Sequence, residues 1–242
     1  MAHRLQRISE PEVMDDRLEV EAYSEADFSD VNRRCARRAL RVAGRERGMA
    51  IDLGTGPAEI PIVLCRLAPG WRVVGLDLSS GMLAEARRNV RAAGLEKRIR
   101  LLRGDAKTAR GLAGRFDLVL SNSLLHHLED PLPFWRQVKR LARPGGAILV
   151  QDLCRPASRP AARSLERLHV SEASPLLRQL FYQSLLAAFT VAEVRAQLRA
   201  AGLHGLVVRK INDRHLVVRG RLSGSSALVA FGNGNVYGNV YG

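Results

Sequence analysis

The sequence contains no uninterrupted apolar stretch long enough to span a bilayer, and its N-terminus lacks the apolar core of a signal peptide. Its three cysteines, Cys35, Cys65 and Cys154, are scattered and odd in number. They have neither the spacing of a metal site nor the arrangement of a disulfide framework. We therefore expect a soluble, cytoplasmic protein with no bound metal and no membrane contact.

Aromatic residues are also few, at 5% of the chain, which leaves little surface on which single-stranded bases could stack. Acidic residues are outnumbered, because 38 Lys and Arg stand against 24 Asp and Glu and give a net charge of +14. Such a charge raises the question of a polyanionic partner. The basic residues, however, are mostly arginines spread along predicted helices. A nucleic-acid partner is therefore possible but not favoured over solvated helix faces.

The length and the apolar content of 46% suit one sizeable α/β domain. We divide the chain into three parts. Residues 1–45 form an N-terminal helical segment or flap, and residues 46–220 form the main domain with a helical insert at about 154–189. Residues 221–242, rich in Gly and Asn, form a flexible tail.

Short apolar runs alternate with segments of helical periodicity along the main domain. The predicted strands are 49–53, 72–78, 99–102, 116–121 and 147–151. Strands separated by helices predict a doubly wound, mostly parallel, Rossmann-like sheet with helices on both faces. Two further apolar runs, 206–211 and 215–218, are separated by a three-residue turn signal, so we expect a C-terminal antiparallel hairpin.

The first predicted strand leads into a glycine turn that could hold a ligand. Gly54 and Gly56 can adopt positive φ and let the backbone approach a bound molecule, and Pro57 suits the first position of the next helix. A dinucleotide-binding turn would have a third glycine where this chain has Glu59, and a pyrophosphate there would meet like charge. A tight turn with no ligand remains the alternative on this stretch alone.

Acidic residues stand at the ends of three successive predicted strands. They are Asp52, Asp77 and Asp105, and the segment 121–127 follows the fourth strand. In an open parallel sheet, ligands bind at the carboxyl ends of the strands. Asp77 is placed to accept both hydroxyls of a ribose, because a carboxylate offers two acceptor oxygens.

These motifs resemble the class I S-adenosylmethionine-dependent methyltransferases, over about residues 45–153 by motif and to Arg219 by element order. The motifs that carry the resemblance are Ile51-Asp52-Leu53-Gly54-Thr55-Gly56, Val74-Gly75-Leu76-Asp77-Leu78-Ser79, Gly104-Asp105-Ala106, Phe116-Asp117-Leu118-Val119 and Pro144-Gly145-Gly146. Within that family the chain looks most like the small-molecule branch that includes ubiquinone and menaquinone biosynthesis enzymes. Motifs of amino-group and cytosine methyltransferases are missing after the fourth strand.

The resemblance implies S-adenosyl-L-methionine as cofactor, S-adenosyl-L-homocysteine as product and in-line methyl transfer to a small-molecule acceptor. It also implies a role for each cofactor-binding residue. Gly54 and Gly56, with Thr55 between them, face the methionine and ribose parts, and Asp52 supports the ammonium. Asp77 holds the ribose hydroxyls, and the backbone near Ser121 and Asn122 closes over the methionine end. The adenine is bound by Leu78, Met82, Asp105 and Ala106.

His127, and secondarily His126, are the candidate catalytic residues, because they follow the fourth strand where an acceptor would approach. Structural roles, one as a helix cap and the other in the core, remain an equal alternative. No metal site is expected at this pair, since adjacent residues of a helix do not face one another. Three other functions stay open: an RNA methyltransferase, a nicotinamide-binding oxidoreductase, and a cofactor-binding protein without transferase activity. Nothing in the sequence favours a particular oligomeric state.

Overall fold

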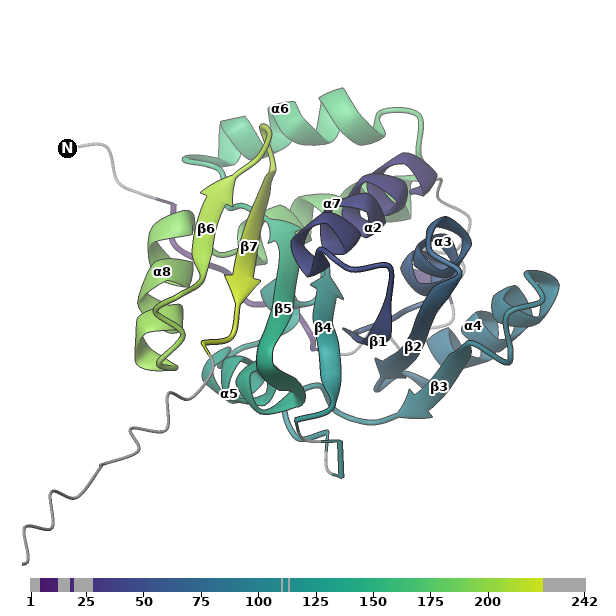
Figure 1. Cartoon of the computed structure of the whole chain (residues 1–242). Coiled ribbons are helices and arrows are strands. Elements are labelled where there is room, and N and C mark those ends of the chain that lie inside the picture. The colour runs from purple at the N-terminus through teal and green to yellow at the C-terminus, as the bar shows by residue number, and fades with distance from the viewer. Residues whose placement is uncertain (1–4, 13–17, 20–27, 110, 113, 224–242) are drawn as a thin grey trace, which may run out of the picture.

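A seven-stranded sheet forms the middle layer of the computed structural model, which describes residues 5–12, 18–19, 28–109, 111–112 and 114–223 (Figure 1). The strands are β1 (Arg47–Leu53), β2 (Gly70–Asp77), β3 (Ile99–Arg103), β4 (Phe116–Asn122), β5 (Ala142–Leu153), β6 (Val207–Lys210) and β7 (His215–Arg221). The helices are α2 (Ser29–Ala43), α3 (Glu59–Leu67), α4 (Ser80–Ala92), α5 (Leu132–Leu141), α6 (Arg159–Val170), α7 (Pro175–Ala187) and α8 (Val191–Ala200), with a short 3₁₀ helix η1 at Leu125–His127.

The strand order is β3-β2-β1-β4-β5-β7-β6, with the first five strands parallel. β7 runs antiparallel to both β5 and β6, which confirms the predicted C-terminal hairpin and the doubly wound sheet. The order reverses direction between β1 and β4, so the carboxyl ends of these two strands flank the crevice where ligands bind in such sheets. The fifth strand begins five residues earlier than predicted, at Ala142, with a register shift opposite Phe116 and Leu118.

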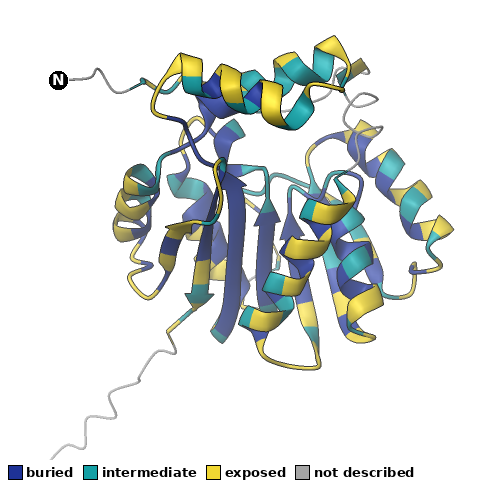
Figure 2. Ribbon diagram, turned by 90° about the horizontal axis from the view of Figure 1, so that it is seen from above, coloured by how far each residue is buried: buried dark blue, intermediate teal, exposed yellow. Residues whose placement is uncertain are grey.

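Helices cover both faces of the sheet because its central strands are apolar on both sides (Figure 2). Ala50 and Leu118 pack in the cluster that includes the apolar residues of α2, α3 and α4. Their neighbours Ile51 and Val119 pack in the opposite cluster, with residues of α5 and α8. Alternating side chains of one strand thus build two separate cores.

The helix ends follow local capping chemistry. Ser79 accepts from the backbone N–H of Met82 at the start of α4, and Thr190 and Glu193 form the predicted capping box of α8. The prediction for Pro57 is wrong, since α3 begins two residues later. Ala58 occupies its N-cap position with a φ of 63°, in the left-handed region.

The predicted helical insert consists of α6 and α7, which pack on each other above the end of β5 through a third, smaller apolar cluster. The part of the predicted tail from residue 224 onward lies outside the described residues, as does most of the segment between 13 and 27. Among the helices that the structure describes, none combines the length and the hydropathy that crossing a membrane requires.

Candidate functional site

The turn after β1 is fastened to β2 through its backbone. The N–H groups of Gly54 and Thr55 both donate to the carbonyl of Leu76, at 2.9 and 3.0 Å, and the N–H of Gly56 donates to Asp77 at 2.8 Å. Ala58 donates within the turn to Thr55, and Pro57 has no N–H. The backbone from 54 to 58 therefore offers no uncommitted donor to a phosphate, in contrast to a dinucleotide-binding turn.

Asp52 is the buried acid of this site, with 1% of its surface exposed. Its Oδ2 accepts from the hydroxyl of Thr55 at 2.9 Å, whereas its Oδ1 has no hydrogen-bond partner among the described residues. Burial raises the pKa of Asp52 from 3.8 to about 7, opposed by the Thr55 hydrogen bond and assisted by the negative charge of Asp77. A carboxylate held in this state would gain from a cationic ligand.

Asp77 and Asp105 lie at the same edge of the sheet as the turn. Asp77 accepts from the backbone N–H of Ser79 as well as that of Gly56, and Asp105 accepts from the backbone N–H of Lys107 at 2.7 Å. Both acids line a cavity, here named the turn cavity. Other residues predicted to bind the cofactor also line this cavity, namely Asp52, Gly54, Thr55, Gly56, Leu78, Met82, Ala106 and Asn122.

Ser121 is the one predicted cofactor residue that the structure places outside the lining of the turn cavity. Its side chain is fully buried, and its hydroxyl donates to the carbonyl of Leu53 at 2.8 Å, so it ties β4 to β1. Asn122, Ser123 and Leu124, which follow it, line the cavity instead.

Asn32 and Glu12 also line the turn cavity, although no sequence pattern marked them as site residues. Asn32 on α2 is buried, and its side-chain amide donates to the carboxylate of Glu59 at the start of α3. Glu12 forms an ion pair with Lys107 across the loop that follows β3. Among the residues that the structure describes, the charged side chains that line the cavity are five carboxylates and one lysine, namely Glu12, Asp52, Glu59, Asp77, Asp105 and Lys107. Its charge suits a cationic ligand better than an anionic one.

A second and larger cavity, here named the lid chamber, lies beneath α6 and α7 and has a volume of about 800 Å³. Apolar side chains of these helices and of the start of α2 line much of it, among them Phe28, Val31, Leu168, Leu177, Leu180 and Phe181. His126 and His215 are among its polar lining residues. Four residues, Asn32, Asn122, Ser123 and His127, line both the lid chamber and the turn cavity.

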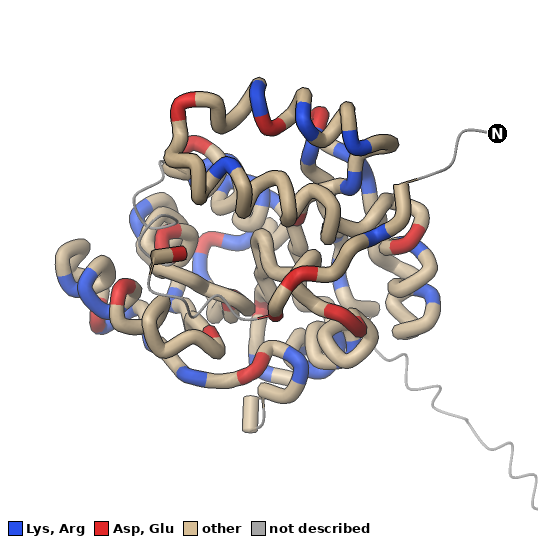
Figure 3. The backbone as a smooth tube through the Cα atoms, turned by 180° about the vertical axis from the view of Figure 1, so that it is seen from behind, with Lys and Arg blue, Asp and Glu red and all other residues tan. Residues whose placement is uncertain are grey.

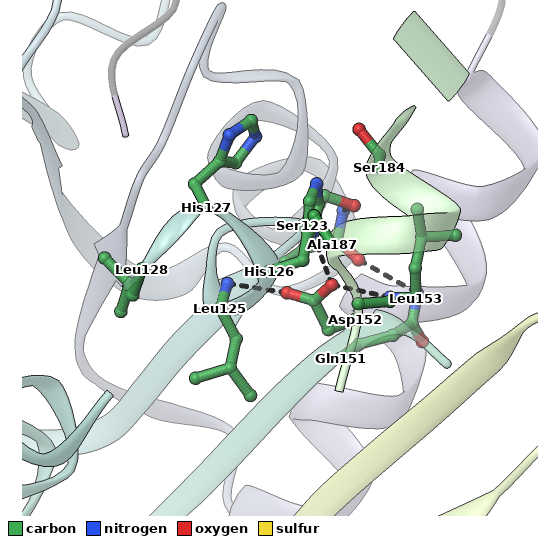
Figure 4. A network of polar contacts seen from close by, with 12 residues as sticks. Ser123, Leu125, His126, His127, Leu128, Gln151, Asp152, Leu153, Ser184 and Ala187 are labelled. Carbon is green, nitrogen blue, oxygen red and sulfur yellow. Dashed lines mark hydrogen bonds and ion pairs between the residues drawn. The ribbon is translucent and has the colours of Figure 1, made fainter. Parts of the chain in front are cut away.

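His126 is held by Asp152, the penultimate residue of β5. The Nδ1 of His126 lies 2.5 Å from Asp152 Oδ1, and the backbone N–H of Leu125 donates to Asp152 Oδ2 (Figure 4). Burial opposes charge on both side chains, but their mutual attraction raises the pKa of His126 and lowers that of Asp152. His126 thus has a fixed ring orientation, with Nδ1 toward Asp152 and Nε2 toward Glu10 at 3.3 Å.

His127 points away from Asp152 (Figure 4). Burial, followed by the charge of His126, lowers the pKa of His127 to about 3. The two histidine rings, on the short 3₁₀ helix η1, nevertheless lie close together, with their centroids 4.3 Å apart. The expectation that they would not face one another, which assumed α-helical spacing, is wrong. Glu10 contacts both rings, at 3.3 Å from His126 Nε2 and 3.1 Å from His127 Nδ1.

Comparison with known proteins identifies the family to which this chain belongs. Residues 51–150 match the family model described as "Methyltransferase domain". The demethylmenaquinone methyltransferase of Thermus thermophilus is 32% identical over 180 residues, which cover 70% of this chain and 80% of that protein. The chain belongs to the S-adenosylmethionine-dependent methyltransferases.

The resemblance to class I enzymes is thereby confirmed, and S-adenosylmethionine is the cofactor of this methyltransferase. A ubiquinone biosynthesis O-methyltransferase of Dinoroseobacter shibae is 34% identical over 49% of this chain and 46% of its own length. The methyltransferase thus spans about half the length of some curated relatives. A solved structure described as a putative S-adenosylmethionine-dependent methyltransferase, from Methanococcus maripaludis, shares the fold with a TM-score of 0.68 at 17% identity, over 92% of this chain and all of that one.

The residues of the turn cavity fit this cofactor. S-adenosylmethionine carries a sulfonium and an ammonium, and the cavity offers carboxylates, including the buried Oδ1 of Asp52, which no described residue hydrogen bonds. Gly54 has a φ of 71°, and a Cβ added there would lie 3.0 Å from Leu124, which also lines the cavity. A side chain at this position would therefore narrow the space for a ligand.

Proposed function

We propose that this methyltransferase transfers the methyl group in line to a small-molecule acceptor bound in the lid chamber. The observation that carries the proposal is the junction of the two cavities. Asn32, Asn122, Ser123 and His127 line both of them, so molecules bound on the two sides of this junction would be neighbours. Holding donor and acceptor in register is the largest contribution that a protein can make to a displacement of this kind.

The chamber supports a small-molecule acceptor by its size and its walls. Sites for small molecules are concave, are lined mainly by apolar side chains with a few polar groups, and have volumes of roughly 300 to 1,000 Å³. The lid chamber has a volume in this range, about 800 Å³, and its walls combine apolar side chains with polar ones such as His126 and His215. The relatives named for demethylmenaquinone and for ubiquinone biosynthesis also point to acceptors of this kind.

Each part of the site then has a task. Asp52 would hold the ammonium of the cofactor, Asp77 the ribose hydroxyls and Asp105 the adenine amino group. When bound, the cofactor supplies an electrophilic methyl group on a sulfonium sulfur. The apolar side chains of α6 and α7 that line the chamber would keep water from the junction of the two cavities and so strengthen the electrostatic contacts there.

His126, with Asp152, is the better placed base for an acceptor that must lose a proton. Asp152 fixes the Nδ1 side of the ring, so that Nε2 can take a proton from a hydroxyl in the chamber. His127, whose pKa is lowered to about 3, would be a weak base. The order of the two predicted catalytic residues is therefore reversed in this proposal, and Asp152 joins them as a positioning residue.

Two competing functions find less support. A nicotinamide dinucleotide would place its pyrophosphate at a turn whose N–H groups are committed and whose cavity is rich in carboxylates. An RNA substrate would favour a concentrated basic surface, whereas Lys and Arg are distributed over several helices and loops (Figure 3).

Calorimetric titration of the purified protein with S-adenosylmethionine, with NADH as control, tests the site directly. We expect micromolar affinity, or roughly 8 kcal/mol, for the first and no binding of NADH. Methyl transfer to a panel of phenols, quinols and amines then tests the acceptor class. RNA that binds in a strongly salt-dependent way and becomes methylated, with no turnover of the small molecules, would contradict the proposal.

The catalytic assignment is tested by His126→Gln and His127→Gln with any hydroxyl acceptor that the panel yields. We expect the first variant to lose at least tenfold in kcat/KM and the second to lose much less, with cofactor affinity retained in both. A larger loss for His127→Gln would return that residue to the role of base.

A further inference from the structure

Three side chains from distant parts of the chain converge between the N-terminal segment and η1. Glu10, His126 and His127 each present a donor atom, and the three atoms lie within 4.8 Å of one another. Glu10 Oε1 is 3.3 Å from His126 Nε2 and 3.1 Å from His127 Nδ1. No metal site was expected at the two adjacent histidines, and nothing in the sequence connects them with Glu10.

These separations match those between ligands of one metal ion. Zinc binds histidine nitrogen and carboxylate oxygen at roughly 2.0 to 2.2 Å, so two ligands of a tetrahedral ion lie about 3.4 Å apart. Both distances from Glu10 fall close to that value. Two histidines and one carboxylate leave further coordination positions open, as in catalytic and regulatory metal sites.

The surroundings supply what a metal ligand needs behind it. His126 offers Nε2 to Glu10 while its Nδ1 is hydrogen bonded to Asp152, the carboxylate that commonly supports a metal-binding histidine. The hydroxyl of Ser184 donates to the carboxylate of Glu10 at 3.2 Å and fixes its position. The positive charge of Arg7 opposes the binding of a cation. Its guanidinium, however, donates hydrogen bonds to the backbone carbonyls of His126 and Leu128.

We propose that Glu10, His126 and His127 bind one divalent transition-metal ion of the zinc type, with an open position toward the lid chamber. His127 Nδ1 also lies 3.2 Å from the carbonyl of Pro11, to which it can donate only when it carries a proton. Metal binding through Nδ1 replaces that hydrogen bond and requires the tautomer in which Nε2 carries the proton. The ion uses the Nε2 lone pair of His126, and metal binding and base catalysis by His126 therefore exclude each other. Bound metal acts as an inhibitor of proton-dependent methyl transfer.

Zinc binding is the direct test and does not depend on methyl transfer. Full-length protein without an affinity tag, stripped with a chelator, is titrated with ZnCl₂ in a calorimeter. We expect one site of micromolar or tighter affinity in the wild-type protein. Glu10→Gln and His127→Gln should each weaken it at least tenfold, while His204→Gln, an exposed histidine outside the site, should leave it unchanged.

Cobalt provides a second probe, because its absorption spectrum distinguishes nitrogen and oxygen ligands from thiolate. We expect a spectrum without a sulfur-to-cobalt charge-transfer band, lost in Glu10→Gln. Zinc affinity that is the same in Glu10→Gln and in the wild-type protein would overturn the proposal, as would a thiolate band from the cysteines or no binding at 100-fold molar excess of zinc. Circular dichroism of each variant confirms that a loss of binding is not a loss of folding.

Discussion

Replacing Asp52 with asparagine should make the protein more stable, and increasingly so as the pH rises. Asp52 is buried and its Oδ1 has no hydrogen-bond partner among the described residues, so the folded state disfavours its charge. Its pKa is about 7 in the folded protein, against an ordinary value of 3.8. Between these values the native state binds a proton that the unfolded chain releases, and stability therefore falls as the pH rises.

The size of the effect follows from proton linkage. The ionisation of Asp52 costs the wild-type protein about 2 kcal/mol at about pH 5 and about 4 kcal/mol at about pH 8, where the loss is nearly complete. Asparagine keeps the shape and can still accept from Thr55, but it does not ionise. Its own intrinsic effect is the same at every pH and cancels in the comparison. The stability of Asp52→Asn relative to wild type should therefore grow by roughly 2 to 3 kcal/mol between the two conditions.

Urea unfolding at both pH values, followed by the fluorescence of the buried Trp71 and Trp135, measures this difference. Ser121→Ala is a suitable control, since it changes a buried polar group that does not titrate, and its effect should be equal at both pH values. If the free-energy difference between Asp52→Asn and wild type is the same at both pH values, the assignment of a raised pKa to Asp52 is refuted.

Three further predictions concern the same end of the sheet. Gly54→Ala should cost about 1 to 3 kcal/mol more than Gly56→Ala in denaturant unfolding, because both have positive φ but only a Cβ at Gly54 meets Leu124; equal costs would contradict this. Asp77→Ala should weaken S-adenosylmethionine binding by about 1 to 3 kcal/mol in calorimetry, the cost of unpairing buried polar groups, and unchanged affinity would remove Asp77 from the ribose site. Asp152→Ala should destabilise the fold by about 1 to 3 kcal/mol, since it leaves the buried Nδ1 of His126 and the backbone N–H of Leu125 without their acceptor, and a loss below about 0.5 kcal/mol in urea unfolding would contradict this role of Asp152.

The sheet and its turn could be predicted from the sequence because their signals are local. Each strand is a short apolar run, and the helices between them begin at residues such as Ser79 and Thr190 whose side chains cap the next turn. The acids at three strand ends could be placed together because the carboxyl ends of parallel strands share one edge of the sheet.

The histidine site could be predicted only in part. His126 and His127 were found from their position after β4, but the closeness of their rings depends on side-chain orientations that no local sequence pattern predicts. Asp152 stands one residue beyond the predicted end of the fifth strand, so the strand-end rule would have included it had the strand been drawn longer. Glu10 could not be found, because its contacts depend on where the N-terminal segment lies in the folded chain.

Contacts of the N-terminal segment also limit the order in which parts of this protein can fold. Arg7 donates to the carbonyl of Ala187, 180 residues later, and Glu10 meets Ser184 across 174 residues. These two contacts can therefore form only after α7 has left the ribosome, later than the contacts of Arg7 and Glu10 with η1. Contacts of such sequence separation form late, because the entropy of closing the chain must be met first. Until α7 is made, the surroundings of His126 lack the contacts that Arg7 and Glu10 make with that helix.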